Sequence, residues 1–387
     1  MLSDPKFGQL FFKKVNRLVL LILLVVSPLL SATSVTTAVV LASIALLMIV
    51  AVSNKDRYGV IDKGVINIFY IKFLWFAICI LIVEFNSTCL IRVLQFVGCL
   101  CAFKAASLLK FKISDLKFVQ IVLALVIGVA LFHMFSTQSF RENVFIYENP
   151  NCYAGILICW IAPFLIFWNS ISKYAIAGLL ILLYSTSARA DLACAFLLLS
   201  TTALLTIQPA FVKRLRMVFW IEIFVLFAFV LIYPLLLEYN MGVVLDEYSQ
   251  EHMGKQLLSG RNQIWLLVFE SIGQSPVIGW GLSTVPKTLY GITLSCHNLF
   301  LQVALQEGII GVLLLIAILY YILKNLVSRP ITRCSITSMC VVFMILLHEC
   351  FEISLTQNLL YIGLMMWFLL GLGLNHNFNT DSKYEQI

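Results

Sequence analysis

Residues 218–237 read VFWIEIFVLFAFVLIYPLLL and contain one charged side chain, Glu222. About 20 predominantly apolar residues form a helix long enough to cross the hydrocarbon core of a bilayer. A helix that is apolar on every face is buried in a protein core or in a membrane. This stretch therefore predicts a transmembrane helix.

The whole chain has a similar composition. Of its 387 residues, 61% are hydrophobic and 12% are charged, whereas soluble domains carry about 25% charge. A soluble enzyme, a disordered chain and a secreted disulfide scaffold are therefore excluded. The eleven cysteines lie mostly in apolar runs, without a C-x-x-C pair, and are expected to pack as small hydrophobic side chains. The predicted class is an all-α, polytopic integral membrane protein.

Twelve apolar segments predict a single transmembrane domain over residues 1–387. They lie near 18–30, 34–52, 65–83, 88–103, 118–136, 152–168, 174–188, 191–207, 218–237, 299–323, 335–350 and 357–374. The segments 88–103 and 174–188 are short, so we expect them to be tilted, broken or partly re-entrant. No internal repeat is visible, which disfavours a transporter built from inverted repeats.

The basic residues predict the orientation. With a cytoplasmic N-terminus, 19 of the 26 Lys and Arg fall in cytoplasmic segments, and Lys72, near an inner helix end, makes 20. The outer side keeps Arg92, Arg141, Arg189, Lys255, Arg261 and Lys287. This bias follows the positive-inside rule and predicts that both termini are cytoplasmic. It also explains the net charge of +7 without a nucleic-acid partner.

One long outer loop, residues 238–298, interrupts the series of spans. Its sequence from Gly260 to Glu270 has an amphipathic helical pattern with a plausible N-cap at Ser259. Pro276 and the turn Gly279-Trp280-Gly281 end the pattern. We expect a helix that lies on the membrane surface over the bundle.

Three outer residues are candidates for chemistry, and each has a simpler alternative. Arg189, in the turn TSARAD, is either paired with Asp191 or binds an anion at membrane depth. Arg261 is either a solvated surface residue or a phosphate ligand, because a planar guanidinium and a helix N-terminus both favour anions. His297 either bonds a backbone carbonyl or acts as a general base. His348 and Glu349, near the outer end of the eleventh span, are expected at the same cavity.

Motifs for metals and nucleotides are missing from the sequence. It contains no H-x-x-x-H, H-E-x-x-H or D-x-D, and no P-loop. We therefore predict no metal and no cofactor, and neither a nucleotide-sugar donor nor ATP-driven transport.

Four short motifs occur in a fixed order. They are R-x-x-x-W at Arg261–Trp265, P-x-x-G-x-G at Pro276–Gly281, the pair His297-Asn298, and G-x-x-G at Gly308–Gly311. Over about 55 residues this set resembles the O-antigen ligase/polymerase superfamily, and the twelve-span layout extends the resemblance over the chain. Arg189 also matches the earlier arginine of that family.

The resemblance implies a metal-independent GT-C-type glycosyltransferase of the bacterial inner membrane, with its active site facing the periplasm. Its donor would be a glycan on undecaprenyl diphosphate, and its partners would include membrane lipids and polysaccharide-assembly proteins. By motif, Arg189 and Arg261 would bind the donor diphosphate. His297 would deprotonate or orient the acceptor hydroxyl, supported by Asn298 and Trp265.

The resemblance leaves the acceptor open. A ligase passes the glycan to the lipid A–core saccharide, whereas a polymerase passes it to another lipid-linked repeat unit. The outer-loop motifs favour the ligase. A more distant alternative is a flippase or transporter of lipid-linked sugar, but that function predicts internal repeats and charges spread over several spans.

Overall fold

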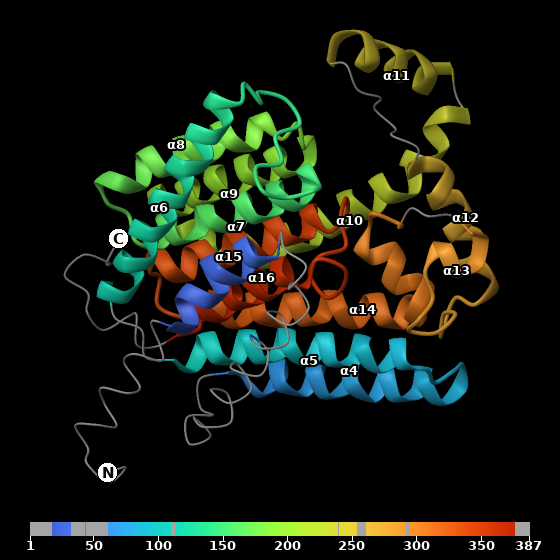
Figure 1. Ribbon diagram of the computed structural model, residues 1–387. Helices are drawn as coiled ribbons and strands as arrows, with labels where there is room; N and C mark the ends of the chain where they lie inside the picture. Colours follow the sequence, from blue (N-terminus) through green and yellow to red (C-terminus); the bar gives the residue numbers. More distant parts are fainter. Residues whose placement is uncertain are drawn as a thin grey trace.

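The computed structural model describes residues 18–31, 43, 61–109, 113–238, 240–253, 261–291 and 295–375, and the regular elements there are all helical. The first described helix, Leu18–Leu30, contains the π turn η1 (Ile22–Val26) and α2 (Ser27–Leu30). The helices of the bundle are α4 (Lys63–Ile82), α5 (Ser87–Leu108), α6 (Ile113–Ser136), α7 (Pro150–Ile166), α8 (Ser170–Ser185), α9 (Arg189–Ile207), α10 (Leu215–Ile232), α14 (Leu299–Val327), α15 (Arg333–His348) and α16 (Leu360–Leu372) (Figure 1).

These helices agree with the predicted spans. Eleven of the twelve segments coincide with helices, and the segment 34–52 lies, apart from Ser43, outside the described residues. Within the described ranges, six helices are long and apolar enough to cross a membrane, and five shorter ones are apolar. The chain is therefore a multi-pass membrane protein, while the count of twelve spans stays a prediction.

The expectation of a short or broken span at 88–103 is wrong. α5 is one continuous helix of 22 residues. The side chain of Asn86 caps its start by accepting from the amide of Cys89. Its last turns pack tightly on α16, since a Cβ added at Gly371 would lie 2.2 Å from the carbonyl oxygen of Phe103. Because Lys104 and Ser107 are polar, the apolar pattern ends near residue 103, and the last turn of α5 was not predicted. α8, by contrast, is short, with 16 residues.

α14 is broken at Gly308, where φ is 68° and ψ is −173°. The break frees backbone groups, and the turn after α12 binds them. Trp280 and Gly281 donate their amides to the carbonyls of Leu305 and Gln306, at 2.8 and 3.0 Å. A Cβ added at Gly308 would lie 2.1 Å from the carbonyl oxygen of Val277, so only glycine fits. The hydrogen bonds between the P-x-x-G-x-G turn and the region of the G-x-x-G break thus attach the outer loop to α14 of the bundle.

The position of Lys72 changes the count of basic residues assigned to the cytoplasmic side. Lys72 lies in the middle of α4, 2% exposed, and its Nζ is 2.6 Å from Glu307 Oε2. It also donates to the carbonyl of Gly311, beyond the break in α14. Lys72 therefore joins two helices inside the bundle and does not mark the cytoplasmic face. The orientation then rests on 19 residues rather than 20.

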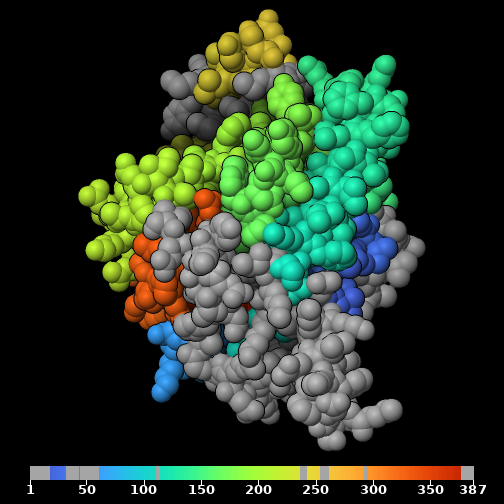
Figure 2. All heavy atoms as spheres, turned by 90° about the vertical axis from the view of Figure 1, so that its left-hand side faces the viewer, coloured from blue at the N-terminus to red at the C-terminus, as the bar shows by residue number. Residues whose placement is uncertain are grey.

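Further helices lie between α10 and α14: η4 (Tyr233–Glu238), α11 (Asn240–Met253), α12 (Arg261–Gln274) and α13 (Pro286–Tyr290). α12 covers most of the segment predicted to be an amphipathic helix, and its Ile264, Trp265 and Val268 are buried. A position on the membrane surface stays a prediction. Its predicted cap, Ser259, lies outside the described residues. α12 and α13 lie together at one end of the bundle (Figure 1). α11 lies at the top of the molecule in both views (gold in Figure 2) and contacts α9 through Ser249.

Candidate functional site

A cavity of about 530 Å³ lies where α7 and α9 begin and α10 and α15 end. Its volume falls within the roughly 300–1,000 Å³ that is usual for small-molecule sites. Its polar lining comes from distant parts of the chain, namely Asn151, Ser187, Arg189, Asp191, Arg261 and Glu352. The fold therefore brings Arg189 and Arg261 to one cavity.

Helix N-termini add positive potential to this cavity. The first turn of α9, Ala188–Asp191, lines it directly. Asn151 lies in the first turn of α7, and Arg261 is the first residue of α12. Unpaired N–H groups and the helix dipole favour an anion at such ends. The cavity thus combines two guanidinium groups with three helix starts.

Arg189 is not paired with Asp191, as the simpler alternative required. Its Nη1 donates to Ser249 Oγ of α11 at 3.3 Å. Asp191 is 2% exposed and faces His348, whose Nε2 lies 3.2 Å from Asp191 Oδ1. Arg189 and Asp191 are two residues apart in α9, so their side chains leave the helix on different faces.

Glu352 lies at the centre of the site, and the sequence reasoning missed it. Its Oε1 accepts from Asn151 Nδ2 at 2.9 Å and from Arg261 Nη2 at 3.4 Å. Its Oε2 lies 3.3 Å from His297 Nδ1. Burial alone would raise the pKa of this carboxyl, but the hydrogen bond and charge of His297 and the charge of Arg261 outweigh burial, so the pKa lies below 4.5.

His297 reaches the cavity through Glu352 and is not itself one of the lining residues. Its φ of 45° is unusual for a residue with a side chain and indicates a conformation imposed by its surroundings. Because a carboxylate can only accept from Nδ1, the neutral form of this ring would carry its proton on Nδ1 and leave the lone pair on Nε2. The pair has the geometry of a histidine base oriented by an acid.

Asn298 and Trp265 hold His297 in place. Asn298 caps α14 by accepting from the amide of Leu301 at 2.9 Å, and its Nδ2 donates to the carbonyl of Cys350 at 3.0 Å. Trp265 Nε1 donates to the carbonyl of Cys296 at 2.8 Å. The Asn298–Cys350 bond ties the backbone beside His297 to the segment that carries Glu352, and the Trp265–Cys296 bond ties it to the helix that begins with Arg261.

His348 and Glu349 form a buried network beneath the cavity rather than part of its wall. His348 Nδ1 lies 2.9 Å from Glu349 Oε1, and both side chains are at most 2% exposed. Glu349 also accepts from Ser354 Oγ at 2.6 Å and from the amide of Leu355 at 3.1 Å. The network fixes the loop around Glu352 against the first turn of α9.

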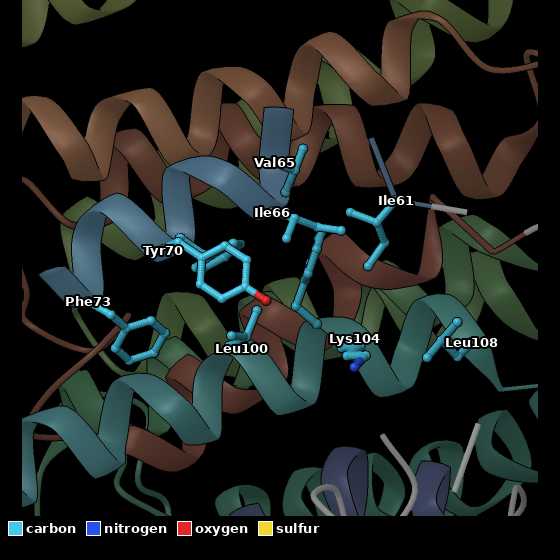
Figure 3. Close-up of a pocket in the computed structure, with 10 residues that line it drawn as sticks. Ile61, Val65, Ile66, Tyr70, Phe73, Leu100, Lys104 and Leu108 are labelled. Carbon is cyan, nitrogen blue, oxygen red and sulfur yellow. The ribbon is translucent and has the colours of Figure 1, made fainter. Parts of the chain in front are cut away.

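A mainly apolar hollow of about 120 Å³ lies between α4 and α5 and contains none of the candidate residues (Figure 3). Among the described residues, no three His, Cys, Asp or Glu side chains are grouped so that they could hold a metal ion. Metal independence stays a prediction.

Comparison with known proteins gives one finding. Residues 174–316, from the start of α8 to the middle of α14, match a family model described as O-antigen ligase. The matched region includes Arg189, Arg261 and His297, whereas Asn151 and Glu352 lie outside it. A search of curated proteins finds no match.

Proposed function

We propose that the chain belongs to the O-antigen ligase superfamily, whose family model matches residues 174–316, and that it moves a glycan from undecaprenyl diphosphate to a saccharide hydroxyl at the periplasmic face of a bacterial inner membrane. The family supports a ligase- or polymerase-type enzyme. The donor, the GT-C-type architecture and the orientation in the membrane are part of the proposal.

One observation carries it. Arg189 and Arg261 line the same cavity, and the His297–Glu352 pair borders that cavity. A lipid diphosphate is a good leaving group, so catalysis mainly requires neutralising its charge and positioning the acceptor. Two arginines and three helix starts would neutralise the charge, and a histidine base would position the acceptor hydroxyl.

The proposed reaction is a single displacement. The acceptor oxygen attacks the anomeric carbon, and its proton passes to His297 Nε2. The bond from that carbon to the diphosphate oxygen breaks, and undecaprenyl diphosphate leaves with both electrons of that bond. Attack opposite the leaving group inverts the anomeric centre. Glu352 stabilises the imidazolium as it forms, while Arg189 and Arg261 bind the charge of the diphosphate.

Ligase activity, with lipid A–core as acceptor, is the leading form of the proposal, and repeat-unit polymerisation is the alternative. A flippase is less well supported, because the candidate charges gather around one cavity instead of lining a path through several spans.

The experiment uses a deletion strain complemented with variants, and gels of its surface lipopolysaccharide. We expect Arg261→Ala and His297→Ala to abolish polysaccharide attachment or growth while the protein stays in the membrane. Lys287→Ala, which removes an exposed cation from α13, is the matched control and should behave as wild type. Normal glycan in both site variants would refute the catalytic assignment.

The deletion strain itself separates the two acceptors. Rough core together with unattached lipid-linked polymer indicates a ligase, and core carrying a single repeat unit indicates a polymerase. Transfer by purified protein in EDTA tests metal independence, and an activity restored only by added Mg²⁺ or Mn²⁺ would contradict it.

A further inference from the structure

A second cavity, of about 780 Å³, lies on the other side of Arg189. It shares Ser187, Ala188 and Arg189 with the first cavity, so the turn before α9 separates the two. The rest of its lining comes from the α6–α7 loop, the end of α8, α9 and α11, and consists of Phe140, Arg141, Glu142, Leu183, Tyr184, Leu192 and His252.

The α6–α7 loop is fixed against this turn. The amide of Asn143 donates to the carbonyl of Ser185 at 3.0 Å, and the amide of Glu142 lies 3.5 Å from its acceptor, Ser187 Oγ. Glu142 has a φ of 52°, and Asn143 is 2% exposed. The loop therefore presents Arg141 and Glu142 to the cavity from a defined backbone conformation.

The lining combines two kinds of group. The rings of Phe140 and Tyr184 are 49% and 73% exposed, although each is large and largely apolar. Beside them lie a guanidinium, a carboxylate and an imidazole, from Arg141, Glu142 and His252. Sugar rings present C–H faces that pack on aromatic rings and hydroxyl groups that pair with charged donors and acceptors. A lipid tail would leave these polar groups without partners.

We propose that this second cavity is a saccharide-binding subsite, in which Tyr184 and Phe140 stack on sugar rings and Arg141 and Glu142 bind sugar hydroxyls. The inference rests on the proposed function, because a lipid-linked glycan whose diphosphate lies at Arg189 can extend past the turn into this cavity. The sugar can come from the donor glycan or from the acceptor, and the same chemistry serves both.

The test measures binding directly, without turnover. Two probes are added to detergent-solubilised full-length protein: the oligosaccharide released from the lipid-linked donor by mild acid, and the core oligosaccharide released from lipopolysaccharide. Saturation-transfer NMR reports which probe binds. We expect one of them to bind the wild type, and its identity separates the donor source from the acceptor source.

Tyr184→Ala and Arg141→Gln should each weaken that binding by about two- to tenfold, as expected for loss of one stacking or polar contact. Tyr174→Ala is the matched control, since Tyr174 lies on the same helix, near its other end, and is 72% exposed. Lys287→Gln is the control for Arg141. Both controls should bind as wild type.

The subsite and the proposed function fail separately. Binding of neither probe, or equal binding by Tyr184→Ala, Arg141→Gln and the wild type, would overturn the subsite even if Arg261→Ala abolishes transfer. Normal glycan in Arg261→Ala would overturn the proposed function, whatever the binding shows.

Discussion

The Glu352→Gln substitution tests the His297–Glu352 pair most directly. Glu352 Oε1 accepts from two donors, Asn151 and Arg261, and Oε2 faces His297 Nδ1. A glutamine at this position would turn its carbonyl oxygen to the two donors and its amide group to His297. The imidazole would then accept at Nδ1 and carry its proton on Nε2, the atom that must take the acceptor's proton.

The expected loss follows from this reversed tautomer. General base catalysis typically contributes about 10²–10⁴-fold to a rate, or roughly 2.7–5.4 kcal/mol of activation free energy. The kcat of Glu352→Gln should fall by about that factor. The KM for the lipid-linked donor should not rise, because a neutral carbonyl oxygen binds Arg261 more weakly than a carboxylate does and competes less with the diphosphate.

Transfer by purified protein with labelled donor gives both constants. Glu270→Gln, an exposed glutamate on α12, is the charge-matched control. Because the two residues act as one unit, Glu352→Gln/His297→Ala should be no slower than His297→Ala. A wild-type kcat for Glu352→Gln, or losses that multiply in the double variant, would refute the reasoning.

Further predictions concern the scaffold and are read from thermal unfolding in detergent. Gly308→Ala should cost at least about 3 kcal/mol, since its Cβ would lie 2.1 Å from a carbonyl oxygen at a φ of 68°. Gly273→Ala, with nothing within 4 Å, should instead stabilise α12 by about 0.5–1 kcal/mol. Lys72→Met should lower the free energy of unfolding by about 3–5 kcal/mol, because Glu307 stays buried without its cation. The double variant Lys72→Met/Glu307→Met should recover most of this loss. Equal stabilities of the single and double variants would contradict the pairing. The lowered pKa of Glu352 means that its ionised form stabilises the fold above about pH 4.5, and this contribution is lost as pH falls through the lowered pKa. The melting-temperature difference between wild type and Glu352→Gln should therefore be level down to about pH 5 and change only below it, whereas a change centred near neutrality would point to another group.

The helices were predictable because a bilayer demands long apolar segments, and hydropathy detects these directly. Lys72 was not predictable in this way. Its partner, Glu307, is 235 residues away in the sequence, so a charge count placed Lys72 at a helix end. The continuation of α5 through Lys104 was missed for a similar reason, because its packing against α16 is a tertiary contact.

The candidate site was predictable in part. Arg189, Arg261 and His297 stood out because outer basic residues are few and their motifs have a fixed order. Glu352 escaped because the candidate site was built from the few outer basic residues, and of the acidic residues only Asp191 and Glu349 were considered beside them. A signal was present, since Glu352 lies in the short connection between the segments 335–350 and 357–374, close to the candidates His348 and Glu349. Asn151 offered less, because an asparagine at a helix start is ordinary capping chemistry.

The contacts around α14 suggest why the outer motifs keep their order and spacing. Asn298 caps the helix and fixes His297 beside the Glu352 segment. The break at Gly308 leaves the carbonyls just before it to accept from the turn that follows α12. Trp265, on α12, donates a hydrogen bond to the backbone next to His297 and so links α12 to the start of α14. The outer part of α14 thus sets the separation between the base and the start of α12, where Arg261 lies. Residues without a chemical role, the glycines above all, are therefore as constrained as the arginines, because a shift at either end of this segment would separate the diphosphate ligand from the base.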